Sequence, residues 1–128
     1  MKLLLDTHVF IWLDTNLNKI PPKVLAWCED PDNQLYLSVV SAWEIQIKQQ
    51  IGKLQLQVTL EDMVQTQQVD NNLVVLPVEL YHIYTLQRLP FHHNDPFDRL
   101  IIAQASAENM SLVSADHRLS QYDIKIIW

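Results

Sequence analysis

Four acidic residues of this 128-residue chain occupy positions from which their side chains could act together. Asp6 directly follows a run of three leucines, and Asp116 follows a second strand-like run at residues 112–115. Glu44 and Asp98 lie in helical patterns whose neighbours at spacings of three and four are largely apolar. A carboxylate among apolar side chains is costly unless it is paired or binds a cation. Parallel strands end at one sheet edge, where ligands bind, so we expect these acids to converge there.

Converging carboxylates without compensating lysine or arginine would repel one another unless a cation were present. Oxygen ligands of this kind suit Mg²⁺ or Mn²⁺. A divalent ion so held can activate water and neutralise the charge that develops on a phosphate. The pattern therefore indicates metal-assisted hydrolysis of a phosphodiester.

Each acid also has an ordinary structural explanation. Asp6 and Asp116 could be turn residues, because Asp is common after strands. Asp98 could complete a capping box with Asp95, and Glu44 could pair with a lysine one turn later. The joint pattern favours a functional cluster, because the four acids are far apart in sequence and each occupies a position that function permits.

Short apolar runs alternate with helical patterns along the whole chain. The expected strands cover residues 2–5, 35–37, 73–76, 111–114 and 125–127. Helical patterns cover residues 7–13, 39–51 and 79–88, and three more open at residues 21–22, 59–62 and 95–96. Continuous apolar strands that alternate with helices predict a mostly parallel sheet covered on both faces. We expect one domain, residues 1–128, with a three-layer α/β/α sandwich.

Several residues carry more detailed expectations. Gly52, the only glycine, is placed to end the helix that carries Glu44 with a left-handed cap, and Leu54 is placed for the accompanying apolar contact. The spacing of Leu80, Ile83 and Tyr84 predicts that they face inward. Aromatic residues are expected in the core by default, with a partner groove or dimer face as the alternative: Trp12, Trp43, Tyr81 and Tyr84.

Composition excludes several other classes. One glycine rules out a Walker loop and a dinucleotide fingerprint, and the single cysteine, Cys28, rules out disulfide frameworks and cysteine-based zinc sites. A net charge of -6 argues against binding nucleic acid through bulk positive charge. No stretch resembles a membrane span or a complete signal peptide, so we expect no membrane association and a cytoplasmic protein.

Five sequence blocks, in register from Lys2 to Trp128, resemble PIN-domain nucleases, and more closely the VapC-type toxins of bacterial toxin–antitoxin pairs. The block Asp95-Pro96-Phe97-Asp98-Arg99 is the most specific of them. The others are Leu3-Leu4-Leu5-Asp6-Thr7-His8, Ser41-Ala42-Trp43-Glu44-Ile45 with Lys48, Gly52-Lys53-Leu54 and Leu112-Val113-Ser114-Ala115-Asp116. Leu119 departs from the pattern, because many relatives have an aromatic residue there.

The resemblance implies an α/β/α fold whose acidic pocket holds Mg²⁺ or Mn²⁺ and cuts RNA. Matched position by position, Asp6 and Asp98 correspond to direct metal ligands. Glu44 and Asp116 correspond to acids that act through water or a second metal. Asp95 fits a helix N-cap better than a ligand.

Cationic and imidazole side chains near these blocks are candidates for contacts with RNA. Arg99 could instead form a salt link to a neighbouring carboxylate, and the histidines could lie in a solvated loop. The candidates for the RNA backbone are Lys48, Arg99 and Arg118, and those for a nearby phosphate are His92, His93 and His117.

The leading hypothesis is a metal-dependent endoribonuclease toxin, held in check by a cognate antitoxin protein and, by resemblance, a homodimer. A non-catalytic PIN-like module that binds RNA or protein is the alternative, and the intact acidic set argues against it. A phosphoryl-accepting receiver-like domain fits poorly, because paired acids after the first strand and a lysine after the last parallel strand are missing.

Overall fold

A five-stranded sheet, parallel throughout, forms the centre of the protein. The computed structural model describes all 128 residues. Its strands are β1 (Lys2–Leu5), β2 (Gln34–Ser38), β3 (Val74–Leu76), β4 (Ser111–Val113) and β5 (Ile126–Ile127). They lie in the order β3-β2-β1-β4-β5, so β1 is central, with β2 on one side and β4 on the other.

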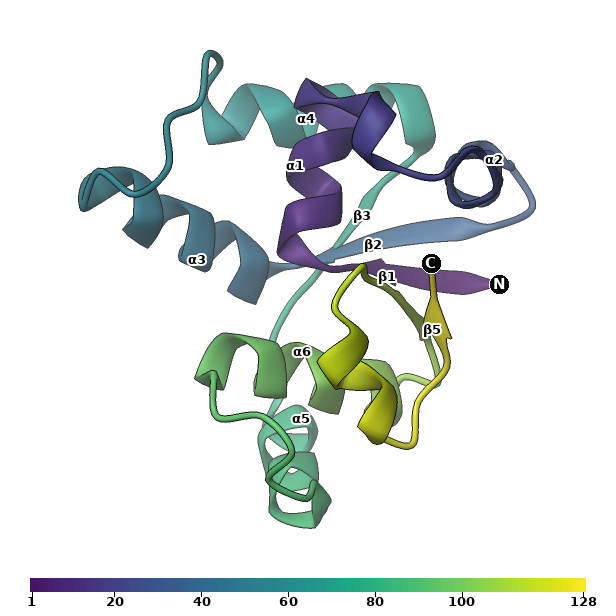
Figure 1. Cartoon of the computed structure of the whole chain (residues 1–128), viewed down its shortest axis with the longest axis vertical. Helices are drawn as coiled ribbons and strands as arrows, with labels where there is room; N and C mark the ends of the chain where they lie inside the picture. Colours follow the sequence, from purple (N-terminus) through teal and green to yellow (C-terminus); the bar gives the residue numbers. More distant parts are fainter.

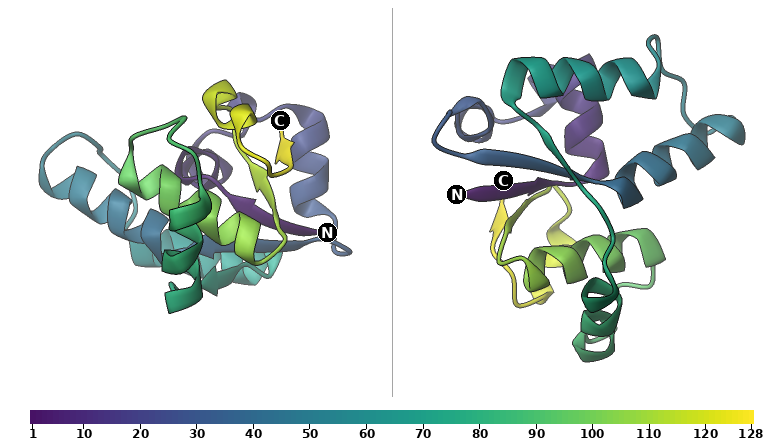
Figure 2. Two further views of the ribbon diagram at one scale, coloured as in Figure 1. Left: turned by 90° about the horizontal axis from the view of Figure 1, so that it is seen from below. Right: turned by 180° about the vertical axis from the view of Figure 1, so that it is seen from behind.

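Six α-helices surround the sheet. They are α1 (Thr7–Thr15), α2 (Pro22–Glu29), α3 (Val39–Gln50), α4 (Leu60–Asn71), α5 (Leu80–Thr85) and α6 (Pro96–Ala107). Figures 1 and 2 show α1, α2 and α4 on one side of the sheet and α5 and α6 on the other. Short 3-10 helices follow α1, α5 and β4, at Leu17–Lys19, Leu86–Arg88 and His117–Gln121. None of the helices is long and apolar enough to cross a membrane.

Alternation along the strands divides the core into two halves. Leu3 and Leu5 pack with α1, α2 and α4, whereas Leu4 packs with α6 on the opposite face. All three leucines of β1 are fully buried. A strand buried on both faces needs a continuous apolar run rather than an alternating one, which is why the sequence indicated a parallel sheet. The predicted α/β/α sandwich is confirmed.

Gly52 ends α3 as expected. Its φ is +77°, in the left-handed region that glycine adopts without a Cβ clash. The amides of Lys53 and Leu54 then donate to the carbonyl oxygen of Lys48, at 2.9 and 3.1 Å. Leu54 packs against the core, so the chain turns back immediately after the helix that carries Glu44.

The expected orientation of α5 is wrong. Leu80, Ile83 and Tyr84 are exposed, whereas His82 is fully buried. His82 Nδ1 accepts a hydrogen bond from the amide of Glu79 at 2.9 Å, and its Nε2 lies 3.0 Å from Glu108 Oε1 at the end of α6. These polar contacts, which hydrophobic spacing does not register, turn the apolar side of α5 outward.

The expectation that the aromatic residues lie in the core is wrong for three of the four. Trp43 is 61% exposed and packs its ring edge-on against Phe97, with 5.2 Å between centroids. Tyr81 and Tyr84 on α5 are at least half exposed. Trp12 is partly buried and packs against the core, as expected.

Candidate metal centre

The four predicted acids line one pocket at the edge of the sheet where the strands end. Asp6 follows β1, Asp116 follows β4, Glu44 comes from α3, and Asp98 from the first turn of α6. Figure 1 shows α1 and α3 leaving this edge from the ends of β1 and β2. Asp95 also lines the pocket, together with four side chains that contain basic nitrogen: His8, Lys48, His93 and Arg118.

Asp6 and Asp116 are joined through Ser114. The Ser114 hydroxyl donates to Asp6 Oδ2 at 2.6 Å and accepts from the Asp116 amide at 3.1 Å. Asp6 also caps α1, because its Oδ1 accepts from the His8 amide at 2.7 Å. Each carboxylate oxygen has two lone pairs, so these bonds fix the Asp6 carboxylate and still leave it able to bind a cation.

Glu44 is 4% exposed, and both of its carboxylate oxygens have partners. Thr7 Oγ1 donates to Oε1 at 2.8 Å, and Lys48 Nζ donates to Oε2 at 2.7 Å. The hydrogen bond to Glu44 raises the pKa of Lys48. The lysine pair considered as an alternative explanation is therefore present, but it forms inside the acidic pocket rather than on the surface.

Asp98 is the carboxylate whose negative charge is least compensated. Burial, together with the nearby charges of Asp95 and Glu44, raises its pKa to about 6. Its Oδ2 lies 2.9 Å from His93 Nε2. Asp95 serves as the N-cap of α6, accepting from the amides of Phe97 and Asp98 at 2.8 and 3.2 Å.

Asp116 is held by Arg118. The arginine donates from Nη2 to Oδ2 at 2.8 Å and from Nε to Oδ1 at 3.0 Å. The hydrogen bonds to Arg118 lower the pKa of Asp116. Arg118 itself is exposed, so salt screens this pair. We therefore expect the pair to open readily when Arg118 binds another anion or when Asp116 binds a cation.

The donor set fits a divalent cation. Asp98 and Asp116 offer carboxylate oxygens within 4.8 Å of each other, with His93 beside them, and Asp6 and Glu44 line the same pocket. Carboxylate oxygens are the ligands that Mg²⁺ and Mn²⁺ prefer. Burial, followed by the nearby charges of Asp95 and Glu44, raises the pKa of Asp98, and a bound cation would favour its charged form.

Arg99 departs from both expectations for it. It is buried, and its Nη1 donates to the carbonyl oxygen of Pro90 at 2.9 Å, while its guanidinium lies over the ring of Phe91. It neither lines the pocket nor pairs with a carboxylate, so its expected RNA contact and its expected salt link are both wrong. Instead it fixes the loop that leads into α6.

Of the three histidines considered, only His93 lines the pocket; His92 packs edge-on against Tyr122 at 5.1 Å, and His117 is exposed. Neither hydrophobic spacing nor the pattern of acids predicts a role for Thr7, His8 or Ser114. Each of them lies within two residues of an acid at a strand end, and this closeness in sequence could have indicated that they line the site or contact its acids.

The fold and the pocket together define an α/β protein that gathers carboxylates at the carboxyl edge of a parallel sheet. The model of the PIN domain family matches residues 3–125, and the chain belongs to that family. A comparison with curated protein sequences gives no significant match.

Solved structures with a similar fold include several toxin–antitoxin complexes. VapBC2 from Rickettsia felis, bound to a DNA fragment from its promoter, matches with a TM-score of 0.72 and 16% identity, covering 99% of this chain and 98% of the other. DNA-bound VapBC from Salmonella typhimurium gives a TM-score of 0.68 and 15% identity, covering 99% of this chain and 97% of the other. VapBC-5 from Mycobacterium tuberculosis gives a TM-score of 0.62 and 20% identity, covering 98% of this chain and 97% of the other. At these identities the likeness is one of fold.

Asp98→Asn is expected to stabilise the metal-free protein. The folded-state pKa of about 6 exceeds the ordinary 3.8, so the folded state binds more protons between these values. The free energy of unfolding therefore falls as pH rises from about 4 to 7 through this group. Asparagine removes that cost, and we expect a gain of about 1–2 kcal/mol at pH 7.5 that disappears near pH 4.

Urea unfolding in the presence of a chelator, at pH 4 and pH 7.5, measures the difference. Asp123→Asn, an exposed carboxylate outside the pocket, serves as the control and is expected to change the free energy of unfolding by less than about 0.5 kcal/mol. An Asp98→Asn protein that is less stable than the native protein at pH 7.5 would contradict the charge argument.

Proposed function

We propose that the protein is an Mg²⁺- or Mn²⁺-dependent endoribonuclease that acts as the toxin of a VapBC-type toxin–antitoxin pair. The convergence of Asp6, Glu44, Asp98 and Asp116 on one pocket is the observation that carries this proposal. Membership of the PIN domain family and the similarity in fold to VapBC complexes support it. An RNA substrate and the lone buried thiol of Cys28 both suit the cytoplasm.

The acids have distinct roles in this proposal. Asp6 and Asp98 hold the ion directly, because each retains free lone pairs and Asp98 lacks a strong cationic partner. Glu44 acts through water, since it is only 4% exposed and the Lys48 ammonium already offsets its charge. Asp116 joins the site when Arg118 gives up part of its contact. When bound, the metal supplies an activated water and neutralises charge on the phosphate.

Groups around the acids keep the site in shape. Ser114 and the amide of His8 orient the Asp6 carboxylate, and Asp95 fixes the first turn of α6 that carries Asp98. Lys48, which lies at the pocket, is held by Glu44 within reach of an anion brought to the site. The substrate phosphate is therefore recognised through the bound cation and a few local donors, so a net charge of -6 does not prevent RNA binding.

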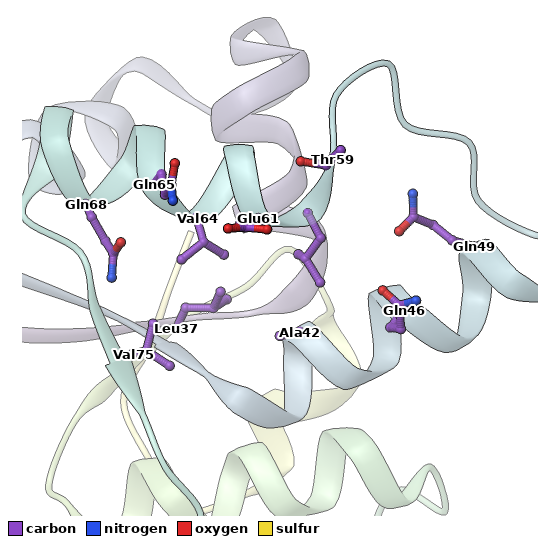
Figure 3. A pocket seen from close by; sticks show the side chains of 11 residues that line it. Leu37, Ala42, Gln46, Gln49, Thr59, Glu61, Val64, Gln65, Gln68 and Val75 are labelled. Atoms are coloured by element: carbon purple, nitrogen blue, oxygen red, sulfur yellow. The ribbon is translucent and has the colours of Figure 1, made fainter.

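An antitoxin is the second partner that we propose. Between α3 and α4 lies a groove with an apolar floor of Leu37, Val64 and Val75 and a rim rich in glutamine, including Gln46 and Gln68 (Figure 3). It is separate from the acidic pocket but uses the same helix, α3, that carries Glu44. Since the similar structures are complexes of toxin with antitoxin, we assign an apolar segment of the antitoxin to this groove.

A second copy of the chain is the third partner that we propose. The exposed side chains Leu80, Ile83 and Tyr84 share one face of α5, opposite the buried His82. An exposed apolar face of this kind on a short surface helix is typical of an association surface. We propose that this face packs against its own copy in a homodimer.

Replacing Asp6 or Asp98 with asparagine is expected to reduce RNA cleavage at least 100-fold and to abolish tight Mn²⁺ binding, because asparagine removes the anionic ligand. Cleavage of a mixed RNA substrate and calorimetric titration with Mn²⁺ measure the two effects. Asp123→Asn is the matched control and should behave like the native protein. If both pocket variants cut RNA like the native protein, the four-acid mechanism is wrong; a native protein that binds no Mn²⁺ would favour the non-catalytic module.

Val64→Glu is expected to leave RNA cleavage unchanged and to weaken inhibition by the antitoxin at least tenfold, because it places a charge on the apolar floor of the groove. The antitoxin to use is the product of a short reading frame next to this gene. Val69→Glu is the control, since Val69 lies on the same helix but is 81% exposed and outside the groove. Equal inhibition of both variants would contradict the assignment of the groove.

Tyr84→Glu is expected to convert the dimer to a monomer, because a carboxylate at the centre of an apolar interface would be buried without a partner. Sedimentation equilibrium gives the mass. The variant should keep its melting temperature as a monomer, since Tyr84 is 60% exposed. A native protein that sediments as a monomer at high concentration would overturn the dimer.

A further inference from the structure

His93 is the pocket residue that the four-acid mechanism does not use. Its side chain is 10% exposed, yet it lines the pocket beside the acids. Nε2 lies 2.9 Å from Asp98 Oδ2 and 3.9 Å from Asp116 Oδ2. Despite this proximity, Nε2 forms no hydrogen bond with any group of the protein. A buried polar atom left without a partner costs free energy, and at a functional site it points to a ligand.

The position of the imidazole proton follows from the other ring nitrogen. The backbone amide of Asp95 points at His93 Nδ1 at 3.2 Å. A backbone N–H can only donate, so Nδ1 accepts and carries no proton. The ring N–H that faces the pocket is then on Nε2.

This arrangement decides between two roles for His93. To bind a metal through Nε2, the ring would have to move its proton to Nδ1, where it would face the Asp95 amide. As an Nε2–H donor, the ring keeps the Asp95 bond and presents a hydrogen to the pocket. The geometry therefore favours a donor over a nitrogen ligand.

The two cationic donors in the pocket are already engaged. Lys48 is bound to Glu44 and Arg118 to Asp116, and His8 is mostly exposed to solvent. His93 lies beside Asp98 and Asp116, so its N–H is adjacent to whatever anion a cation held there would bind. Phosphate oxygens are strong acceptors of hydrogen bonds from such donors.

We propose that His93 is a catalytic residue that donates its Nε2–H to a non-bridging oxygen of the scissile phosphate. This inference rests on the proposed nuclease function. The role transfers no proton: the hydrogen stays on Nε2, and the bond orients the phosphate and stabilises the charge that develops on it.

Two substitutions separate the two ring nitrogens. His93→Asn keeps an oxygen acceptor near the position of Nδ1, so the Asp95 amide stays satisfied, but it removes the donor. His93→Gln places an amide N–H near the position of Nε2. His92→Ala changes the exposed neighbour in the same loop and is the control.

The experiment titrates inorganic phosphate into the Mn²⁺-loaded protein, and Mn²⁺ alone into the metal-free protein, with RNA cleavage as a further measurement. We expect His93→Asn to weaken phosphate binding and to lower kcat/KM about 10- to 100-fold. His93→Gln should restore most of both, and Mn²⁺ affinity should stay within about threefold of native in both variants. His92→Ala should match the native protein.

Two results would overturn the inference. If His93→Asn loses Mn²⁺ affinity in parallel with phosphate affinity, His93 is a nitrogen ligand of the metal. If His93→Asn binds phosphate like the native protein, His93 has no part in recognising it. Both differ from failure of the proposed function, in which Asp98→Asn itself still cuts RNA; the phosphate titration tests His93 even without a known RNA substrate.

Discussion

Carboxylates brought to one sheet edge repel one another, and the contacts around the pocket act against this repulsion. Asp6 and Asp116 are carried there by the ends of neighbouring parallel strands, and Glu44 and Asp98 by helices that begin at the same edge. A single hydrophobic core could not tolerate this charge, since burial opposes ionisation of each group. The raised pKa of Asp98 reflects this burial, and in the function that we propose a divalent cation supplies the compensating charge.

Local contacts, rather than bulk positive charge, offset the repulsion among these carboxylates. Serine and threonine hydroxyls donate to the two most enclosed acids, at Ser114 and Thr7, and two basic side chains pair with Glu44 and Asp116. Helix caps add more, because Asp6 and Asp95 accept backbone amides while they line the pocket. The carboxylates of Asp6, Glu44 and Asp116 are therefore held in place before any ion binds, and preorganisation of this kind lowers the cost of assembling a charged site.

Much of this arrangement could be predicted from local sequence, and the reasons for the failures are physical. The acids after the strands, the Asp95-Pro96 helix start and the left-handed Gly52 depend on neighbours within a few residues. The wrong predictions depended on distant partners. Leu80, Ile83 and Tyr84 face solvent because His82 binds Glu108 across the helix pair, and Arg99 is buried because loop carbonyl oxygens receive it. The spacing of apolar residues does not predict such polar contacts. A helix can therefore present its apolar side to solvent when hydrogen bonds hold a histidine on its buried side.

A calorimetric titration of Mn²⁺ at pH 5.5 and pH 7.5, in buffers of different ionisation enthalpy, tests whether uncompensated carboxylates form a cation site. If uncompensated carboxylates form the site, affinity rises at least threefold between the two pH values, since Asp98 must lose its proton to bind the ion. Proton release should also be measurable at pH 5.5, should decline at pH 7.5 and should be absent from Asp98→Asn. Tight binding that is independent of pH and unchanged in Asp98→Asn would contradict the account.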